Sequence, residues 1–419
     1  MAETTRAKLK ERAGGFRLIT GDRVLWVILA ALAIISILVI YSSSAKMGYS
    51  VSDARSVTDL LREQLKNVLI CIFALLVVHK INCRIYGRWA WFIYGCCWLL
   101  TLAPYFKESG INDAHRWIFG IQPNEALKIA TVILLARQLA ARQSIIDRLR
   151  IVPSLNPAKW FNSPEQKKIW RQGTFPILMP VVLACAVILP AHTSAALLVF
   201  VISLIMMYVG RVRRSELLKI VLLAVSAAVL LSLVRVGRTE TAGGRFSTWK
   251  QTLLESRSDV SANNLTDTER SMIAIYEGGL FGKGAGQSAV RVELTHPECD
   301  YTFAFFVEEY GLFMALIVMS FYMWIAVRGI VIFTRCETAF PGLLVLGMVM
   351  IVALQALLHI FVSVNFFPET GQTLPFISRG GSSMLFATAA MGIVLSVSRQ
   401  NDEKSHDKPR GESILERNS

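Results

Sequence analysis

Long apolar runs alternate along this chain with short polar segments. A hydrocarbon core about 30 Å thick requires roughly 20 apolar residues per helix, and at these lengths only helices satisfy their backbone hydrogen bonds across lipid. The pattern therefore predicts an all-α, polytopic membrane protein with about ten transmembrane helices. The predicted helices cover residues 24–41, 65–78, 89–104, 123–139, 175–190, 193–209, 217–234, 303–327, 341–361 and 381–397.

Lys and Arg gather in alternate loops, as the positive-inside rule describes for cytoplasmic segments. These segments are residues 8–23, 80–88, 142–171, 211–219 and 328–335. The sorting favours an even number of spans, with both termini in the cytoplasm. It divides the chain into a cytoplasmic segment over residues 1–23, a membrane domain over 24–398, and a polar, disordered cytoplasmic tail over 399–419.

Two outer segments differ from simple connections. Residues 235–302 form a large predicted extracytoplasmic loop between helices 7 and 8, with nearly equal numbers of acidic and basic residues. Loops of this length are usually functional or disordered. Apolar positions within 246–254 fit one side of an interfacial helix. Residues 362–380 form a second outer loop with a high density of Gly, Pro and Ser.

Composition supports the membrane assignment and argues against other classes. The chain is 53% hydrophobic and 18% charged, whereas soluble proteins carry about 25% charged residues. The net charge of +14 lies in loops, with no basic stripe with interleaved aromatics, which argues against nucleic-acid binding. The seven cysteines show no CxxC or Cys/His spacing, so neither a disulfide framework nor a zinc site is predicted.

Ionisable residues occur inside one predicted helix. Pro123 fits its first turn, and Glu125 and Lys128 then lie three residues apart on one face, where they can pair. Charged groups within a membrane helix are costly and usually face a polar cavity. The alternative is a pair at the helix end whose charged groups extend to the membrane surface.

A glycine-rich segment, residues 271–288, precedes the eighth helix. Its glycines permit tight turns and close backbone approach. Successive backbone N–H groups there could hold a pyrophosphate. No strand precedes the segment in a βαβ pattern, so a nucleotide-binding fold is not predicted.

Three carboxylates accompany the start of the eighth helix. Asp300 stands where the outer loop becomes a helix, and the helix dipole favours a negative charge there. A simple N-cap is the alternative function for this side chain. Glu308 and Glu309 lie about two turns deeper, and at least one of them must face a polar interior or a partner.

Residues 368–383, Pro-Glu-Thr-Gly-Gln-Thr-Leu-Pro-Phe-Ile-Ser-Arg-Gly-Gly-Ser-Ser, precede the last helix. Small residues at a helix start permit close helix contact, and irregular backbone at this depth occurs beside protein or a watery cavity. A plain connecting loop is the alternative.

In this order, these four segments resemble the SEDS family (FtsW/RodA) of cell-wall polymerases, over about residues 24–399. The resemblance implies a ten-helix fold and an inverting peptidoglycan glycosyltransferase that polymerises lipid II. Asp300 matches the family's catalytic carboxylate, and Glu125 and Lys128 match its intramembrane acid–base pair. The structural motif positions are Glu308, Glu309, Pro368, Gly371 and Pro375. The candidate contacts to substrate or pyrophosphate are Glu125, Lys128, Arg116, Arg245, Arg270, Ser378, Arg379, Gly380, Gly381, Ser382 and Ser383.

The resemblance also implies partners and a location. The partners are lipid II, a class B penicillin-binding protein and other division-complex proteins, and the location is the inner membrane at the division septum, with the active site on the extracytoplasmic side. No cofactor motif is evident, although a divalent cation (Mg²⁺ or Mn²⁺) could assist the leaving group. A lipid II flippase, a scaffold for the transpeptidase and a RodA-like elongation polymerase are the alternatives.

The chain departs from the family pattern at several positions. His192 occupies the place of a family Asp, and His359 stands where an Asn is usual. Asn124 replaces a Ser, and Arg379 replaces a common Tyr. The outer-loop departures are Asp267, Arg270 and residues 295–299. All leave Asp300 in place, but they affect the transfer of substrate contacts from the family.

Overall fold

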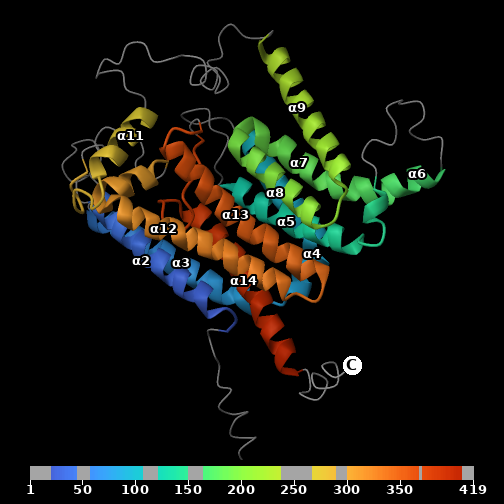
Figure 1. The fold of residues 1–419 in the computed structure, drawn as a ribbon, viewed down its shortest axis with the longest axis horizontal. Coiled ribbons are helices and arrows are strands. Elements are labelled where there is room, and N and C mark those ends of the chain that lie inside the picture. Colours follow the sequence, from blue (N-terminus) through green and yellow to red (C-terminus); the bar gives the residue numbers. More distant parts are fainter. Residues whose placement is uncertain are drawn as a thin grey trace, which may run out of the picture.

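The described part of the chain folds as a bundle of helices in a computed structural model. The structure describes residues 20–44, 57–106, 121–149, 164–236, 267–288, 300–367 and 370–407. Each of the ten predicted segments coincides with a long helix (Figure 1). These helices are α2 (Arg23–Ser44), α3 (Val57–Lys80), α4 (Cys83–Leu102), α5 (Pro123–Ala141), α7 (Phe175–Ala191), α8 (Thr193–Val209), α9 (Arg214–Val236), α12 (Thr302–Thr334), α13 (Ala339–Ser363) and α14 (Gly381–Asp407).

Shorter helices connect or flank these ten in the described ranges. The outer segment contains α11 (Asp267–Gly278), and α6 (Pro164–Ile169) continues through the π-helix η5 (Trp170–Thr174) into α7. The 3₁₀ turns are η2 (Ala103–Phe106) and η3 (Ile146–Arg148). The predicted interfacial helix over 246–254 lies outside the described residues.

In the described chain, five helices are long and apolar enough to cross a membrane, or six if α3 and α4, bent by 109°, form one broken span. The predicted count of ten exceeds this number for physical reasons visible in the sequence. Helix α5 carries three charged residues, Glu125, Lys128 and Arg137, and α8 has only 17 residues. Helix α3 begins at Val57, earlier than the predicted Leu65. The apolar pattern missed its first two turns because they contain several polar residues.

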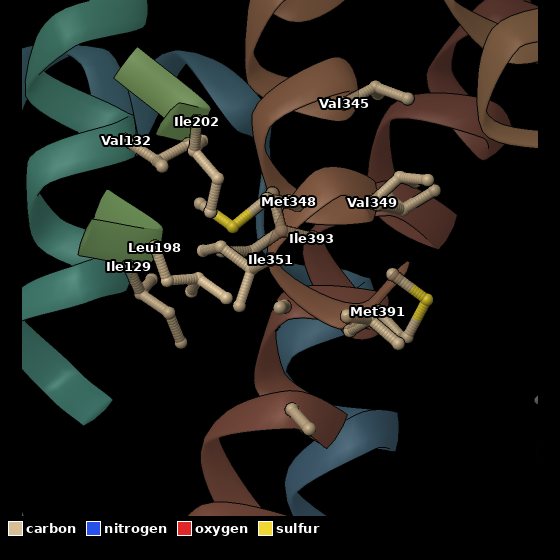
Figure 2. Close-up of a cluster of buried hydrophobic side chains, with 14 of the residues drawn as sticks. Ile129, Val132, Leu198, Ile202, Val345, Met348, Val349, Ile351, Met391 and Ile393 are labelled. Carbon is tan, nitrogen blue, oxygen red and sulfur yellow. The ribbon is translucent and has the colours of Figure 1, made fainter. Parts of the chain in front are cut away.

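Helix α13 lies at the centre of the bundle and packs against α5, α8, α12 and α14. Figure 2 shows side chains from α5, α8 and α13 meeting there, among them Val132, Ile202 and Met348. Gly347 allows this close approach, since a Cβ at that position would lie 2.4 Å from Val132 Cγ1. This centre is apolar and close-packed, so polar groups buried inside the bundle need hydrogen-bond partners.

The basic loops lie together at one end of the bundle. Arg399 donates to the Lys80 carbonyl (3.2 Å), and Arg137 donates to the Arg88 carbonyl (3.2 Å). Arg142 donates to the Gln172 carbonyl (2.5 Å). Asp22 and Arg328 form an ion pair (2.8 Å) at the same end, so the described start of the chain lies near the cytoplasmic end predicted for α12. This grouping agrees with the alternation that the charge pattern predicts.

The C-terminal segment differs from its predicted disorder. Helix α14 continues to Asp407, so residues 399–407 are helical. Arg399 pairs with Glu403 one turn on (2.8 Å), and Lys404 pairs with Glu337 in the connection between α12 and α13 (3.7 Å). The polar composition of this segment did not distinguish a solvated helix from a disordered tail. Residues 408–419 are outside the described ranges.

Candidate active site

Asp300 lies immediately before α12, at the end of that helix opposite the basic loops, and is half-buried. The N-cap position is Tyr301, not Asp300. Tyr301 is buried against Ala274 of α11 and Val362 of α13, and its hydroxyl lies 3.3 Å from Thr268 Oγ1. Three helices therefore fix the backbone that carries the Asp300 carboxylate.

Glu308 and Glu309 are buried in α12, with exposed fractions of 0% and 1%. Glu308 pairs with Lys283 (2.9 Å) and accepts a hydrogen bond from Ser288. Glu309 accepts from the backbone N–H of Gly286 (3.0 Å) and from Ser42 Oγ. Burying a charge is costly unless it is paired and hydrogen-bonded, and here the partners come from the glycine-rich loop and α2. The two carboxylates thus anchor that loop to the bundle.

The glycine-rich loop lies in direct backbone contact with α12. Helix α12 is interrupted at Gly311, which has φ 81° and ψ 168°. A Cβ there would lie 2.4 Å from the Leu280 carbonyl oxygen, and a Cβ at Gly282 would lie 2.3 Å from that of Glu309. Leu312 N donates to the Gly279 carbonyl across the contact (2.9 Å). Glycine is required on both sides because any side chain would separate the two segments.

The sequence suggested that backbone N–H groups of this loop hold a pyrophosphate. That hypothesis is wrong for the N–H groups of Gly282, Lys283, Gly284 and Gly286. These N–H groups already donate within the protein, so they are not available to an anion. The bonds run from Gly282 N to Gly278 O (2.8 Å), from Lys283 N to Glu308 O (2.9 Å), from Gly284 N to Glu309 O (3.0 Å) and from Gly286 N to Ser42 Oγ (2.8 Å). The loop is a structural element beside the site.

Lys283 connects the loop to two carboxylates. Its ammonium pairs with Glu277, at the end of α11, and with the buried Glu308. Hydrogen bonding to Glu277 raises the pKa of Lys283, and the bond to Glu308 acts in the same direction. The charge on Lys283 is therefore retained at neutral pH, where Glu308 needs it.

Glu125 and Lys128 form the predicted ion pair, with 2.8 Å between Oε2 and Nζ. Their side chains are 7% and 1% exposed, so the alternative of a pair reaching the membrane surface is wrong. Lys128 also donates to Gln355 Oε1 of α13 (2.9 Å). Gln355 in turn donates to the Thr373 carbonyl (3.1 Å), which links the pair to the loop before α14.

Residues 370–383 form an ordered polar connection between the helices. Ser378 Oγ accepts from Leu374 N (2.8 Å) and donates to Thr302 Oγ1 (2.9 Å), two residues after Asp300. Ser383 accepts from Thr373 (2.7 Å). The remaining motif contacts are Ser382 Oγ with Gln122 N (3.3 Å), the Pro375 carbonyl with the Tyr322 hydroxyl, and Gly371 in a left-handed conformation with φ 62°. The alternative of a plain loop does not fit this set of contacts.

The candidate arginines are distributed differently. Arg379 pairs with Glu63 of α3 (3.1 Å), and Arg270 lies 4.0 Å from Asp267 within α11. Each is a quarter exposed. Gly381 is the first residue of α14 and lies against Asn67, and Gly380 directly precedes the helix. Arg116, Arg245 and Pro368 are outside the described residues.

The two histidine departures converge on one residue, Gln372, through its backbone carbonyl and its side-chain amide, which the sequence did not predict. His359 Nδ1 lies 2.7 Å from the Gln372 carbonyl, and the Gln372 amide nitrogen lies 3.3 Å from His192 Nδ1. Both histidines are 1% exposed. They come from α13 and from the turn between α7 and α8, and together they fix the middle of the 370–383 loop. The only sequence signal was that both positions depart from the family pattern.

Among the described residues, no group of three or more His, Cys, Asp or Glu side chains is arranged to hold a metal ion. Glu308 and Glu309, the two adjacent buried acids of α12, are already neutralised or hydrogen-bonded by protein groups. The described chain thus contains no ready-made ligand set for a divalent cation.

Removal of the Lys128 charge is expected to destabilise the bundle. Lys128→Met would leave Glu125 buried without its partner, a change that typically costs about 3–5 kcal/mol. Lys219→Met is the matched control, since Lys219 pairs with Glu216 at the same spacing (2.7 Å) but is 43% exposed. In thermal unfolding of the purified protein, the melting temperature should fall strongly for Lys128→Met and only slightly for Lys219→Met. The double exchange Glu125→Lys with Lys128→Glu should recover part of the lost stability. Equal destabilisation by Lys128→Met and Lys219→Met would contradict this account.

The fold and the site together define a polytopic, all-helical membrane protein that carries a buried ion pair and presents a carboxylate at the end of the bundle opposite its basic loops. The chain belongs to the FtsW/RodA/SpoVE family of cell cycle proteins, whose family model matches residues 22–403.

Relatives and solved structures agree with this membership. Stage V sporulation protein E of Bacillus subtilis is 26% identical over 388 residues, covering 90% of this chain and 97% of its own. A probable peptidoglycan glycosyltransferase FtsW of Trichlorobacter lovleyi is 26% identical over 398 residues, covering 91% and 94%. A chain of a peptidoglycan synthase complex shares the fold with a TM-score of 0.66 at 18% identity, covering 91% and 98%. The rod shape determining protein RodA of Thermus thermophilus does so with 0.58 at 20%, covering 91% and 97%.

Proposed function

We propose that this protein is a peptidoglycan glycosyltransferase that polymerises lipid II into glycan strands and releases undecaprenyl pyrophosphate. Family membership and relatives named as probable peptidoglycan glycosyltransferases support the reaction class. The observation that supports the assignment to a site is the Asp300 carboxylate, carried on backbone that three helices fix through Tyr301, beside the 370–383 loop. By the positive-inside rule, the end that carries Asp300 faces outward.

In the proposed reaction, Asp300 is the general base. Its carboxylate accepts the proton of the acceptor GlcNAc 4-hydroxyl, and that oxygen attacks C1 of the donor MurNAc from the face opposite the pyrophosphate. The C1–O bond to the pyrophosphate breaks, and the electron pair leaves with undecaprenyl pyrophosphate. Attack on an α-linked donor therefore gives a β-linked strand.

The leaving group needs positive charge or hydrogen-bond donors. Lys128 already contacts Glu125 and Gln355 and is 1% exposed, which favours a positioning role for it. Arg379 and Arg270 are more accessible and lie on the same side of the bundle as Asp300, so we favour them as contacts to the pyrophosphate. A divalent cation, if bound at the site, would supply additional positive charge to the leaving group.

Two assays on one proteoliposome preparation test the function against its main alternative. We expect full-length protein, reconstituted with a class B transpeptidase, to convert lipid II into glycan strands resolved by gel electrophoresis. A fluorescent lipid II should not change leaflets faster than in empty liposomes. Rapid leaflet exchange without glycan strands would support a flippase, and neither activity would support a scaffold.

A class B penicillin-binding protein is the partner we propose, since a structural neighbour belongs to a synthase complex that coordinates polymerisation with crosslinking. Septal synthesis in cell division is the cellular role we favour over elongation, by analogy with the relatives named FtsW. Depletion should therefore produce filamentous cells. Round cells would indicate a RodA-like elongation role.

A further inference from the structure

A basic recess lies at the end of the bundle opposite Asp300. It has a volume of about 670 Å³ and is open to the surroundings. Its lining consists of four cationic side chains, one amide and one proline, without a carboxylate: Arg142, Lys167, Lys168, Arg171, Gln172 and Pro176. A concave surface that gathers four positive charges attracts anions and focuses their field.

Packing fixes the walls of this recess. Arg142 follows α5, where its Nε donates to the Gln172 carbonyl (2.5 Å) and its Nη1 donates to the Gln138 carbonyl (3.3 Å). Gly173 lies directly against Leu149, because a Cβ at 173 would lie 2.2 Å from Leu149 Cδ2. The π-helix η5 has a wider turn than the α-helices on either side of it, and π-helical turns often occur at functional positions.

The recess lies at the start of a helix that is long and apolar enough to cross a membrane. The span that includes α7 begins at Lys167, so three of its cations stand at the first turns of a membrane-crossing segment. Figure 1 shows α6 leading away from the bundle at this point. Phe175 and Val182, which follow on α7, are 46% and 60% exposed and present an apolar surface for acyl chains. Cations next to a lipid-facing apolar surface are suited to a molecule with a phosphate at one end and hydrocarbon at the other.

We propose that this recess binds the phosphate of an anionic phospholipid headgroup, with the acyl chains lying along α7. Basic pockets between transmembrane helices on the cytoplasmic side bind such headgroups in other membrane proteins. The site is separate from the residues assigned to catalysis and would be occupied by a lipid of the inner leaflet. Its role is to fix the junction of α5, α6 and α7 against the membrane surface.

Native mass spectrometry of the full-length protein, titrated with phosphatidylglycerol or phosphatidylcholine, tests this proposal. Wild type should bind phosphatidylglycerol more tightly than phosphatidylcholine. The triple variant Lys167→Gln, Lys168→Gln, Arg171→Gln should bind phosphatidylglycerol on the order of tenfold more weakly and phosphatidylcholine unchanged. The matched control is Arg84→Gln, Arg88→Gln, Arg213→Gln, which removes the same charge from exposed positions at the same end and should bind like wild type.

Three results would overturn the proposal. Equal weakening in the control variant would show general attraction to the surface rather than a site. A site for a free anion would be shown by two results together: wild type binds the two lipids with equal affinity, and inorganic phosphate competes with lipid in wild type but not in the triple variant. Unchanged phosphatidylglycerol binding in the triple variant would show that lipid binds elsewhere. If the triple variant does not fold, Lys167→Gln with Lys168→Gln alters only exposed side chains and should show the same direction.

Discussion

Asp300→Asn should reduce glycan synthesis from lipid II by at least about 100-fold, because an amide cannot accept the proton of the attacking hydroxyl and general bases contribute about 10²–10⁴ to a rate. The side chain keeps its size, and the backbone around it remains fixed by Tyr301. Thermal stability and binding of the transpeptidase should therefore be unchanged. The measurement is strand formation by the reconstituted complex at saturating lipid II.

Glu269→Gln is the control for this experiment. Glu269 is another carboxylate of the outer segment, in the first turn of α11, and is not part of the proposed site. It should retain nearly full synthesis. Glycan synthesis by Asp300→Asn at the wild-type rate would exclude Asp300 as the general base. A topology test gives a second contradicting result: labelling of Gln287→Cys, at an exposed position of the same outer segment, by a reagent confined to the cytoplasmic side would place the site on the wrong side of the membrane.

Gly311→Ala should destabilise the contact between the glycine-rich loop and α12 by at least about 2 kcal/mol. Two effects act together, since the new Cβ would lie 2.4 Å from the Leu280 carbonyl oxygen and the backbone has φ 81°. Hydrogen exchange of residues 278–288 should accelerate, and synthesis should fall because this loop is no longer anchored to α12, the helix that follows Asp300. Hydrogen exchange with mass spectrometry measures the first effect directly.

Two glycine controls separate these causes. Gly286 has φ 77° but no atom within 4 Å of an added Cβ, so Gly286→Ala carries the backbone strain without the collision. Gly95 in α4 likewise has open space around it and lies in a helix, so Gly95→Ala should be neutral or slightly stabilising. If Gly286→Ala destabilises the protein as much as Gly311→Ala does, then backbone conformation alone, and not close packing, requires glycine at position 311.

The sequence predicted those features that depend on local pattern. Apolar runs located the helices, and the spacing of Glu125 and Lys128 predicted their ion pair. The helix start at Thr302, next to Asp300, also followed from local composition. These succeed because helix formation and i,i+3 pairing involve residues near one another in the chain.

Features that depend on distant residues were not predictable. Glu309 receives hydrogen bonds from Ser42 and Gly286, which lie 267 and 23 residues away in the chain. The second contact occupies one of the loop N–H groups that the glycine-rich pattern alone leaves available for a pyrophosphate. The meeting of His192 and His359 at Gln372 likewise joins positions 180 and 13 residues from it. Length and apolar composition alone leave α5 out of the membrane spans, although its Glu125 and Lys128 neutralise each other inside the bundle.

The interruption of α12 at Gly311 separates two mechanical tasks. The nine residues before it, from Thr302, are almost entirely enclosed by protein, whereas Leu312, Phe313 and Met314 just after it are exposed on the bundle surface. A continuous helix of this length would span about 50 Å, well beyond a hydrocarbon core of about 30 Å. The segment before the break lies against the glycine-rich loop, and the segment after it packs on α13, where Gly329 lies against Val349. Only the second segment then has to match the thickness of the hydrocarbon core, so the length of the first is set by the loop and the site and not by the bilayer.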